Sequence, residues 1–336
     1  MSLYNIKHIV SKKPKWGLVF PRLNISVPYP LFLLVHITLF CDQKCDWCYQ
    51  KNDGFYSSHS MNMEAGLFEK ILASFILFKP HIHIYGGEPL LHPDFPKFLE
   101  YCRVYKYRPT LTTNGKYLDK YSDVIRNSTL SQLNISLNGF LDSNGNISLE
   151  SGKKLKEFIK VNKGIKKINL NYAVGPDNCA CLVDILSHFN NSFKKGDFSY
   201  FVIQHRISSV TPGIHADEVS GIRRFSEILR EIRNMKLNFK LIFLPYIKAG
   251  DLESYYVTDH PFKDECYIPW VGLSILPDAM VTPGGGVFGC NFVLGNLKES
   301  SIMKIWKGAP LNNFRSELIR QGLPESCNRC CHKLYY

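Results

Sequence analysis

The chain has 336 residues, of which 45% are hydrophobic and 21% are charged, as is typical of a folded globular protein. Its formal net charge is +12, but the lysines are spread in short groups, which argues against a nucleic-acid-binding surface. The longest apolar run, residues 30–40, is well short of the roughly 20 residues that span a bilayer. No secretory signal precedes it. We therefore expect a cytoplasmic protein with no membrane partner.

Predicted strands and helices alternate along most of the chain. The expected strands are 31–39, 81–85, 108–113, 130–137, 166–174 and 198–207, with a weaker one at 238–244. The expected helices are 61–77, 93–106, 116–127, 149–161, 181–189 and 220–235. Such alternation is typical of parallel βαβ units. The predicted fold class is therefore α/β, a partial (β/α)6 TIM-like barrel, with its ligand site at the carboxyl ends of the strands.

The 11 cysteines are an odd number, and in a reducing compartment clustered thiols indicate metal or iron-sulfur sites. Three of them, Cys41, Cys45 and Cys48, follow the first strand at CxxxCxxC spacing. An ordinary [4Fe-4S] cluster takes four cysteines, so three would leave one iron open to a small molecule. A zinc site is the alternative for this spacing in isolation. For Cys102, Cys179 and Cys181 we expect buried packing positions.

A second motif, YGGEPLLHP, follows the second strand. Gly86 and Gly87 would let the backbone approach a ligand closely, and Glu88 could present a carboxylate to an ammonium group. The other interpretation of GGEP is a tight turn before the helix that begins near Pro93. Strand alternation also places His81, His83 and Tyr85 on one face, either in the barrel interior or in the core.

Together, CxxxCxxC after the first strand and GGEP after the second resemble the radical S-adenosylmethionine (SAM) superfamily, from about residue 30 to residue 245. The resemblance implies that Cys41, Cys45 and Cys48 bind a [4Fe-4S] cluster whose open iron takes S-adenosyl-L-methionine. It further implies cofactor contacts from the GGEP segment and from the next two strand ends; the candidates are Gly86, Gly87, Glu88, Pro89, Asn114 and Ser136. Asn138 stands where related enzymes often have an aspartate, so no charged ribose contact is expected there.

The C-terminal region resembles the SPASM domain, or its shorter form called twitch. The likeness rests on a cysteine before WVGLSILPD, a cysteine before GNL, the IW and FR helices and a terminal CxxCC. It implies one auxiliary [4Fe-4S] cluster with four thiolate ligands, Cys266, Cys290, Cys327 and Cys330. Cys331 could replace Cys330, and a four-cysteine zinc knuckle is the structural alternative. The implied organisation is an N-terminal extension (1–29), a radical SAM barrel (30–245) and an auxiliary-cluster domain (246–336).

The resemblance implies an enzyme of oxidoreductase or epimerase type that cleaves SAM reductively and abstracts hydrogen through a 5′-deoxyadenosyl radical. We favour a small-molecule substrate such as a sugar or aminocyclitol, because one auxiliary cluster is implied and the segment before residue 31 is short for a peptide-recognition domain. The alternatives are a ribosomal-peptide maturase and, more remotely, a non-catalytic binding or electron-transfer protein. A flavodoxin or ferredoxin is the implied electron donor, and the net positive charge would attract such an acidic partner.

Overall fold

The computed structural model describes residues 27–45, 48, 50, 62–75, 77–141, 147–206, 216–244, 247–256, 266–284 and 292–323. Its centre is a ten-stranded sheet in the order β10-β9-β8-β1-β2-β3-β4-β5-β6-β7. Neighbouring strands from β1 to β7 all pair in parallel. These seven strands are β1 (Phe32–Thr38), β2 (His81–Gly86), β3 (Thr110–Thr113), β4 (Gln132–Ser136), β5 (Lys167–Val174), β6 (Tyr200–His205) and β7 (Leu241–Leu244).

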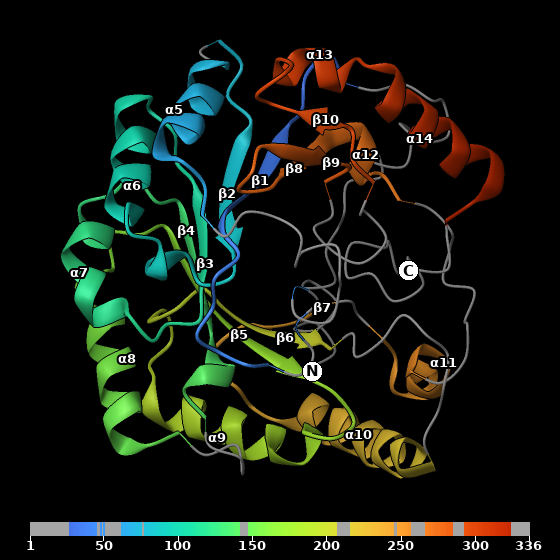
Figure 1. Cartoon of the computed structure of the whole chain (residues 1–336). Coiled ribbons are helices and arrows are strands. Elements are labelled where there is room, and N and C mark those ends of the chain that lie inside the picture. Colours follow the sequence, from blue (N-terminus) through green and yellow to red (C-terminus); the bar gives the residue numbers. More distant parts are fainter. Residues whose placement is uncertain are drawn as a thin grey trace.

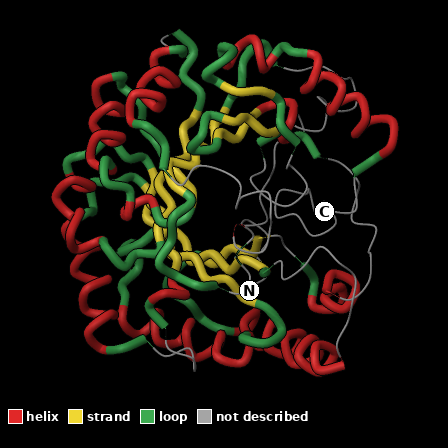
Figure 2. The backbone as a smooth tube through the Cα atoms, in the orientation of Figure 1, coloured by secondary structure: helices red, strands yellow, loops and turns green. Residues whose placement is uncertain are grey.

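Helices connect successive strands and cover the outer, convex face of the curved sheet (Figure 1; Figure 2). They are α5 (Ala65–Ala73), α6 (Phe95–Val104), α7 (Leu118–Arg126), α8 (Leu149–Val161), α9 (Leu182–Ser192) and α10 (Ala216–Asn234). Short 3-10 helices follow some strand ends: η2 (Pro89–Leu91), η3 (Leu137–Gly139), η4 (Cys179–Cys181) and η5 (Ala249–Asp251), the last leading into α11 (Leu252–Tyr256). The architecture is a mixed α/β fold consistent with a partial TIM barrel.

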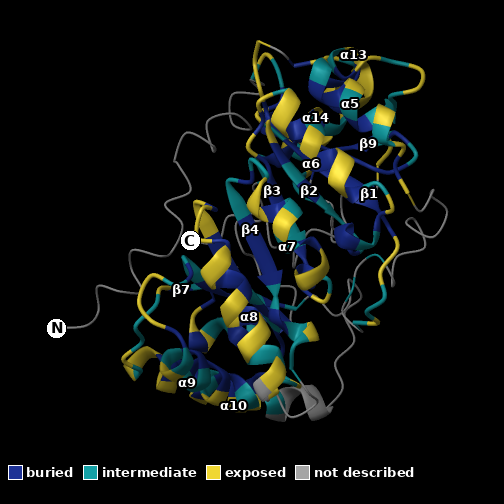
Figure 3. Ribbon diagram, turned by 90° about the vertical axis from the view of Figure 1, so that its left-hand side faces the viewer, coloured by how far each residue is buried: buried dark blue, intermediate teal, exposed yellow. Residues whose placement is uncertain are grey.

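The main core lies between the sheet and this helical layer. On β4, for example, Leu133 and Ile135 are fully buried against the helices, while the residues between and beside them are polar. Successive side chains of a strand point to opposite faces, so this pattern puts the apolar face outward and a polar face inward. Figure 3 shows the result, with buried strands behind helices whose outer faces are exposed.

The C-terminal segment continues the same sheet. It comprises α12 (Ile268–Val271), β8 (Gly272–Ile275), β9 (Met280–Thr282), β10 (Gly295–Asn296), α13 (Ile302–Trp306) and α14 (Ala309–Gln321). Strand β8 pairs in parallel with β1, and β9 folds back antiparallel to β8. The guanidinium of Arg315 on α14, 2% exposed, donates to the carbonyl of Pro269 on α12 and lies over the Trp306 ring of α13. These contacts fasten the C-terminal helices together and to the sheet.

The predicted strands and helices are all confirmed, including the weaker strand, now β7. The structure adds one strand to the parallel array that the sequence did not indicate, because β8 joins β1 from the far end of the chain. Cys102 and Cys179 are buried packing residues as expected, whereas Cys181 is half-buried beside the Tyr172 hydroxyl. No helix among the described residues is long and apolar enough to cross a membrane.

Candidate active site

The three clustered cysteines lie on the loop that leaves the carboxyl end of β1, and the GGEP segment runs beside the start of that loop. The amide of Gly87 donates to the Thr38 carbonyl and the amide of Glu88 donates to the Phe40 carbonyl, both at 2.8 Å. A Cβ at Gly86 or Gly87 would overlap these same backbone atoms, and Gly86 has φ of +136°. Glycine is therefore required here so that β2 can hold the root of the cysteine loop.

The Glu88 side chain points into the protein rather than outward. It is fully buried, and its carboxylate accepts hydrogen bonds from the amide of Leu90 (2.9 Å), the hydroxyl of Thr113 (2.7 Å) and the amide of Asn114 (2.6 Å). Burial raises its pKa to about 7, against the lowering effect of these hydrogen bonds. Glu88 thus ties the end of β2 to the end of β3. Its contact with a cofactor ammonium remains a prediction.

Asp42, directly after the first cysteine, anchors the cysteine loop to the end of β3. Its carboxylate accepts from Lys116 Nζ at 2.6 Å, from the Tyr117 hydroxyl at 2.9 Å and from Asn114 Nδ2 at 3.2 Å. Partial burial acts to raise the pKa of Asp42, but the hydrogen bonds and the charge of Lys116 outweigh it and lower the pKa. Asn114, predicted as a cofactor contact, is 8% exposed and spans Asp42 and the Lys116 amide.

Two glutamines hold the rest of the loop. The Gln43 side chain lies directly against Gly139, just beyond β4, and its Oε1 lies 3.8 Å from the Cys45 sulfur. At the other end, Gln50 Nε2 lies 3.2 Å from Nδ1 of His36, which is buried on β1. Sequence reasoning missed these residues and Asp42. They occupy or flank the variable positions of CxxxCxxC, where spacing carries no signal about the anchoring side chain.

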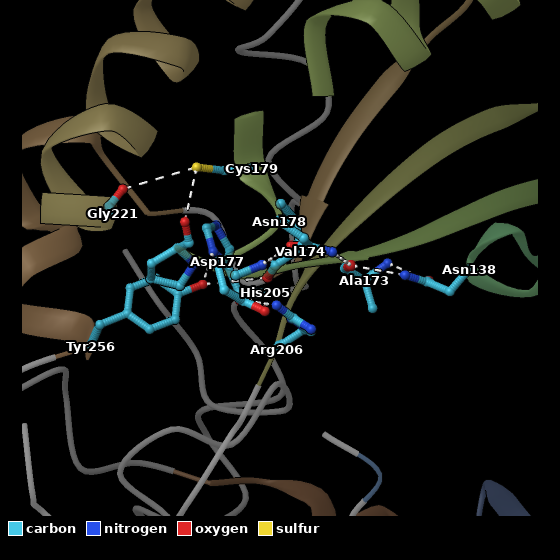
Figure 4. A network of polar contacts seen from close by, with 12 residues as sticks. Asn138, Ala173, Val174, Asp177, Asn178, Cys179, His205, Arg206, Gly221 and Tyr256 are labelled. Atoms are coloured by element: carbon cyan, nitrogen blue, oxygen red, sulfur yellow. Dashed lines mark hydrogen bonds and ion pairs between the residues drawn. The ribbon is translucent and has the colours of Figure 1, made fainter. Parts of the chain in front are cut away.

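The remaining predicted contacts also lie at strand ends. Pro89 begins η2 directly after β2, and Ser136 is the half-buried last residue of β4. Asn138, two residues further on, makes two hydrogen bonds with the backbone of Ala173, so it joins β4 to β5 instead of reaching outward (Figure 4). The structure thus brings the ends of β1 to β4 around one loop, as predicted from the parallel fold.

For the auxiliary cluster, only part of the predicted ligand set can be placed. Cys266 is half-buried and lies just before α12. Cys290, Cys327 and Cys330, together with the alternative Cys331, lie outside the described residues. Among the described residues, no three His, Cys, Asp or Glu side chains meet at metal-ligand spacing. For both the cysteine loop and the auxiliary cluster, the identity of the cysteines that bind iron therefore remains a prediction.

The donor chemistry nevertheless fits an iron-sulfur group. Three thiols share one short loop, thiolates are the ligands of such clusters, and glycine backbone rather than bulky side chain borders the loop on the β2 side. With these three thiols on the loop after the first strand of a partial barrel, the chain has the features of an α/β protein that binds an iron-sulfur cluster.

Residues 35–180 match the sequence model of the radical SAM superfamily, and residues 266–331 match that of SPASM, an iron-sulfur cluster-binding domain. The chain belongs to the radical SAM superfamily and carries a C-terminal SPASM domain. Its cofactors are accordingly a [4Fe-4S] cluster, SAM and an auxiliary iron-sulfur cluster.

Two relatives match part of this chain. A probable GTP 3′,8-cyclase of Methanococcus maripaludis is 34% identical over 146 residues, covering 40% of this chain and 47% of the relative. The Archaeoglobus fulgidus protein of the same name is 28% identical over 191 residues, covering 55% of this chain and 60% of the relative. The match spans about half the length of the first of these relatives.

Among solved structures, SuiB of Streptococcus suis bound to S-adenosylmethionine has a TM-score of 0.60 at 19% identity, covering 89% of this chain and 70% of SuiB. SuiB bound to its precursor peptide SuiA has a TM-score of 0.62 at 19% identity, covering 91% and 71%. At this identity the likeness establishes the fold. It extends over both the barrel and the C-terminal segment.

Proposed function

We propose that this radical SAM enzyme abstracts hydrogen from a small, polar substrate such as a sugar or aminocyclitol, leading to oxidation or epimerisation. The observation that carries the proposal is the three-thiol loop at the carboxyl end of β1, braced by residues from β2, β3 and β4. When bound there, a [4Fe-4S] cluster supplies the electron that splits the sulfonium bond of SAM, giving the radical that takes hydrogen from the substrate.

Cys41, Cys45 and Cys48 would hold that cluster. The protein's own part is to keep their loop in place, which the hydrogen bonds of Asp42 and of the Gly87 and Glu88 amides do. The proposed SAM contacts stand at the same end of the sheet; they are Gly86, Gly87, Glu88, Pro89, Asn114 and Ser136. Cys266, Cys290, Cys327 and Cys330 would hold a single auxiliary cluster, which could accept the electron that a substrate oxidation releases.

The test compares anaerobically reconstituted wild type with a Cys41, Cys45, Cys48 triple alanine variant. We expect about eight irons per wild-type chain and about four in the variant, as two clusters and one cluster require. Wild type should form 5′-deoxyadenosine from SAM with a strong reductant, and the variant should form none. Zinc in place of iron, or iron without SAM cleavage, would refute the catalytic proposal.

A peptide maturase is the second candidate, supported by the likeness in fold to SuiB, whose structure holds the precursor peptide SuiA. The GTP 3′,8-cyclase relatives instead favour a small substrate. Candidate peptides and candidate sugars, each added to the SAM cleavage assay, separate the two: the true substrate becomes modified as 5′-deoxyadenosine accumulates.

The electron donor would be a reduced flavodoxin or ferredoxin. Such carriers are usually acidic, and the +12 charge of this chain would speed their encounter. Reduction of the reconstituted enzyme by flavodoxin should therefore slow as salt concentration rises. A rate that is independent of ionic strength would contradict electrostatic steering.

A further inference from the structure

The inner, concave face of the sheet carries a continuous band of polar side chains that neither the cysteine loop nor the predicted SAM contacts use. The side chains of His83, Thr112, Asn134 and Asn169 come from four successive strands, β2 to β5. We call these four residues the inner polar belt. They lie on the face opposite the helical layer, because each alternates along its strand with fully buried apolar neighbours such as Ile84, which packs in the core.

Hydrogen bonds join the belt from strand to strand. His83 Nε2 lies 2.8 Å from Thr112 Oγ1, Asn134 Nδ2 donates to Thr112 Oγ1 at 3.1 Å, and Asn169 Nδ2 donates to Asn134 Oδ1 at 3.0 Å. Asn134 Oδ1 accepts a second bond from Gln132 at 3.0 Å. These bonds fix the side chains in single orientations, as a preorganised recognition surface requires.

Two acceptors on β5 have no partner in this arrangement. Asn169 is 7% exposed, and its Oδ1 is buried with no hydrogen bond to any described residue. The Oδ1 of Asn171, one inward position nearer the carboxyl end, is buried and lacks a bond in the same way. A buried acceptor without a donor costs about 1–3 kcal/mol, so each of these oxygens favours an incoming hydroxyl or amine. Asn171 pairs in register with Ser136, the proposed SAM contact at the end of β4.

The charge of this face narrows the ligand class. The described inward positions of β2 to β6 hold histidine, tyrosine, threonine, serine, asparagine and glutamine, together with the apolar Ala173 and Val202, and no acidic side chain. The lysine among them, Lys167, is at the amino end of β5, away from the cysteine loop. Apart from His83, the belt holds no ionisable side chain that could pair with a charged ligand, whereas its neutral amides and hydroxyls match the alternating donors and acceptors of a polyol.

We infer that the inner polar belt, with Asn171 above it, binds an uncharged polyhydroxylated ligand, a sugar or cyclitol, whose hydroxyl groups donate to the carboxamide oxygens of Asn169 and Asn171. This inference rests on the proposed function, since it places the substrate below the loop where SAM would be cleaved. It assigns recognition to β5 and specifies neutral rather than anionic substrates.

The test uses ligand-observed saturation-transfer NMR on the reconstituted full chain. The probes are myo-inositol and methyl α-D-glucopyranoside, compared with glucose 6-phosphate and a blocked Gly-Ser-Gly tripeptide. The variants are Asn171→Leu, which removes the acceptor, and Asn171→Asp, which keeps one; Asn313→Leu on the exposed side of α14 is the matched control. The side-chain oxygen of Asn171 makes no hydrogen bond with a described residue, so its replacement should leave the fold intact, and far-UV circular dichroism checks this.

We expect the neutral polyols to give the strongest transfer to wild type and a signal about fivefold weaker in Asn171→Leu, as the loss of one hydrogen bond predicts. Asn171→Asp and Asn313→Leu should retain the signal. Equal signals in wild type and Asn171→Leu, or strongest transfer to the tripeptide or the phosphate, would overturn the inference. The binding assay needs no SAM cleavage, so 5′-deoxyadenosine formation without polyol binding rejects the ligand class alone, and the reverse result rejects the radical reaction alone.

Discussion

Replacing Thr113 with valine isolates the bond that ties β3 to the buried carboxylate of Glu88. Thr113 is 2% exposed, and valine matches its shape without the hydroxyl. The change removes the 2.7 Å bond to Glu88 and leaves the Gly115 amide, which donates to the Thr113 oxygen at 3.0 Å, without an acceptor. A hydrogen bond to a charged group contributes about 1.5–3 kcal/mol and an orphaned buried amide costs about 1–3 kcal/mol, so we expect a loss of about 3 kcal/mol in unfolding free energy.

With an unfolding entropy of about 2.1 cal/mol/K per residue, about 3 kcal/mol corresponds to a fall of roughly 4 °C in melting temperature for cooperative unfolding of the 336-residue chain. Differential scanning calorimetry of the full chain measures it. Thr282→Val on β9 is the control, because Thr282 is equally buried and its hydroxyl makes no hydrogen bond with a described residue. Equal melting temperatures for Thr113→Val and Thr282→Val would refute the role assigned to the Thr113 hydroxyl. The hydrogen bond from Thr113 lowers the pKa of Glu88, so in Thr113→Val this pKa should rise above its wild-type value of about 7.

Three further changes test other parts of the structure. Asp42→Ala should free the cysteine loop from β3 and reduce iron uptake on reconstitution, measured against Asp119→Ala on the exposed face of α7; equal iron content would show that the anchor is dispensable. Burial lowers the pKa of His205 from 6.5 to about 3, so as pH falls the unfolded chain is protonated at this histidine before the folded chain is. Between about pH 7.5 and pH 5, the unfolding free energy of wild type should therefore fall by about 2 kcal/mol more than that of His205→Gln, as measured by urea titration. Arg315→Met should destabilise the packing of α14 against α12, seen as faster hydrogen exchange in residues 309–321, whereas unchanged exchange would contradict the assigned role of Arg315.

The strands and helices of the barrel could be predicted from the sequence, because the βαβ pattern is a local signal that repeats. Alternation along β2 placed His83 and Tyr85 on one face, and the structure confirms the inner face for His83 through its bond to Thr112. The candidate binding loops after the first two strands could also be identified, since thiol spacing and paired glycines restrict what a strand end can bind.

What the sequence could not predict depends on pairs of residues far apart in the chain. The three partners of Asp42 lie more than 70 positions away, and no periodicity links them. The other partners of Glu88 were equally hidden, because Thr113 and Asn114, which donate to its carboxylate, lie 25 and 26 positions further along the chain. The pairing of β8 with β1 likewise depends on backbone hydrogen bonds, which any apolar strand could form.

The pairing of β8 with β1 also determines when the cysteine loop can reach its final conformation during synthesis. Strand β1, which leads into the cysteine loop, lies between β2 and β8, a strand that the ribosome makes long after β1, with Phe32 opposite Gly272. Until residues 272–275 emerge, one edge of β1 has no strand to pair with, and such edges invite wrong pairing. Closing contacts so distant in sequence is slow. The loop that would receive iron therefore reaches its final conformation only after β8 has been made, so cluster insertion should follow the synthesis of residues 272–275.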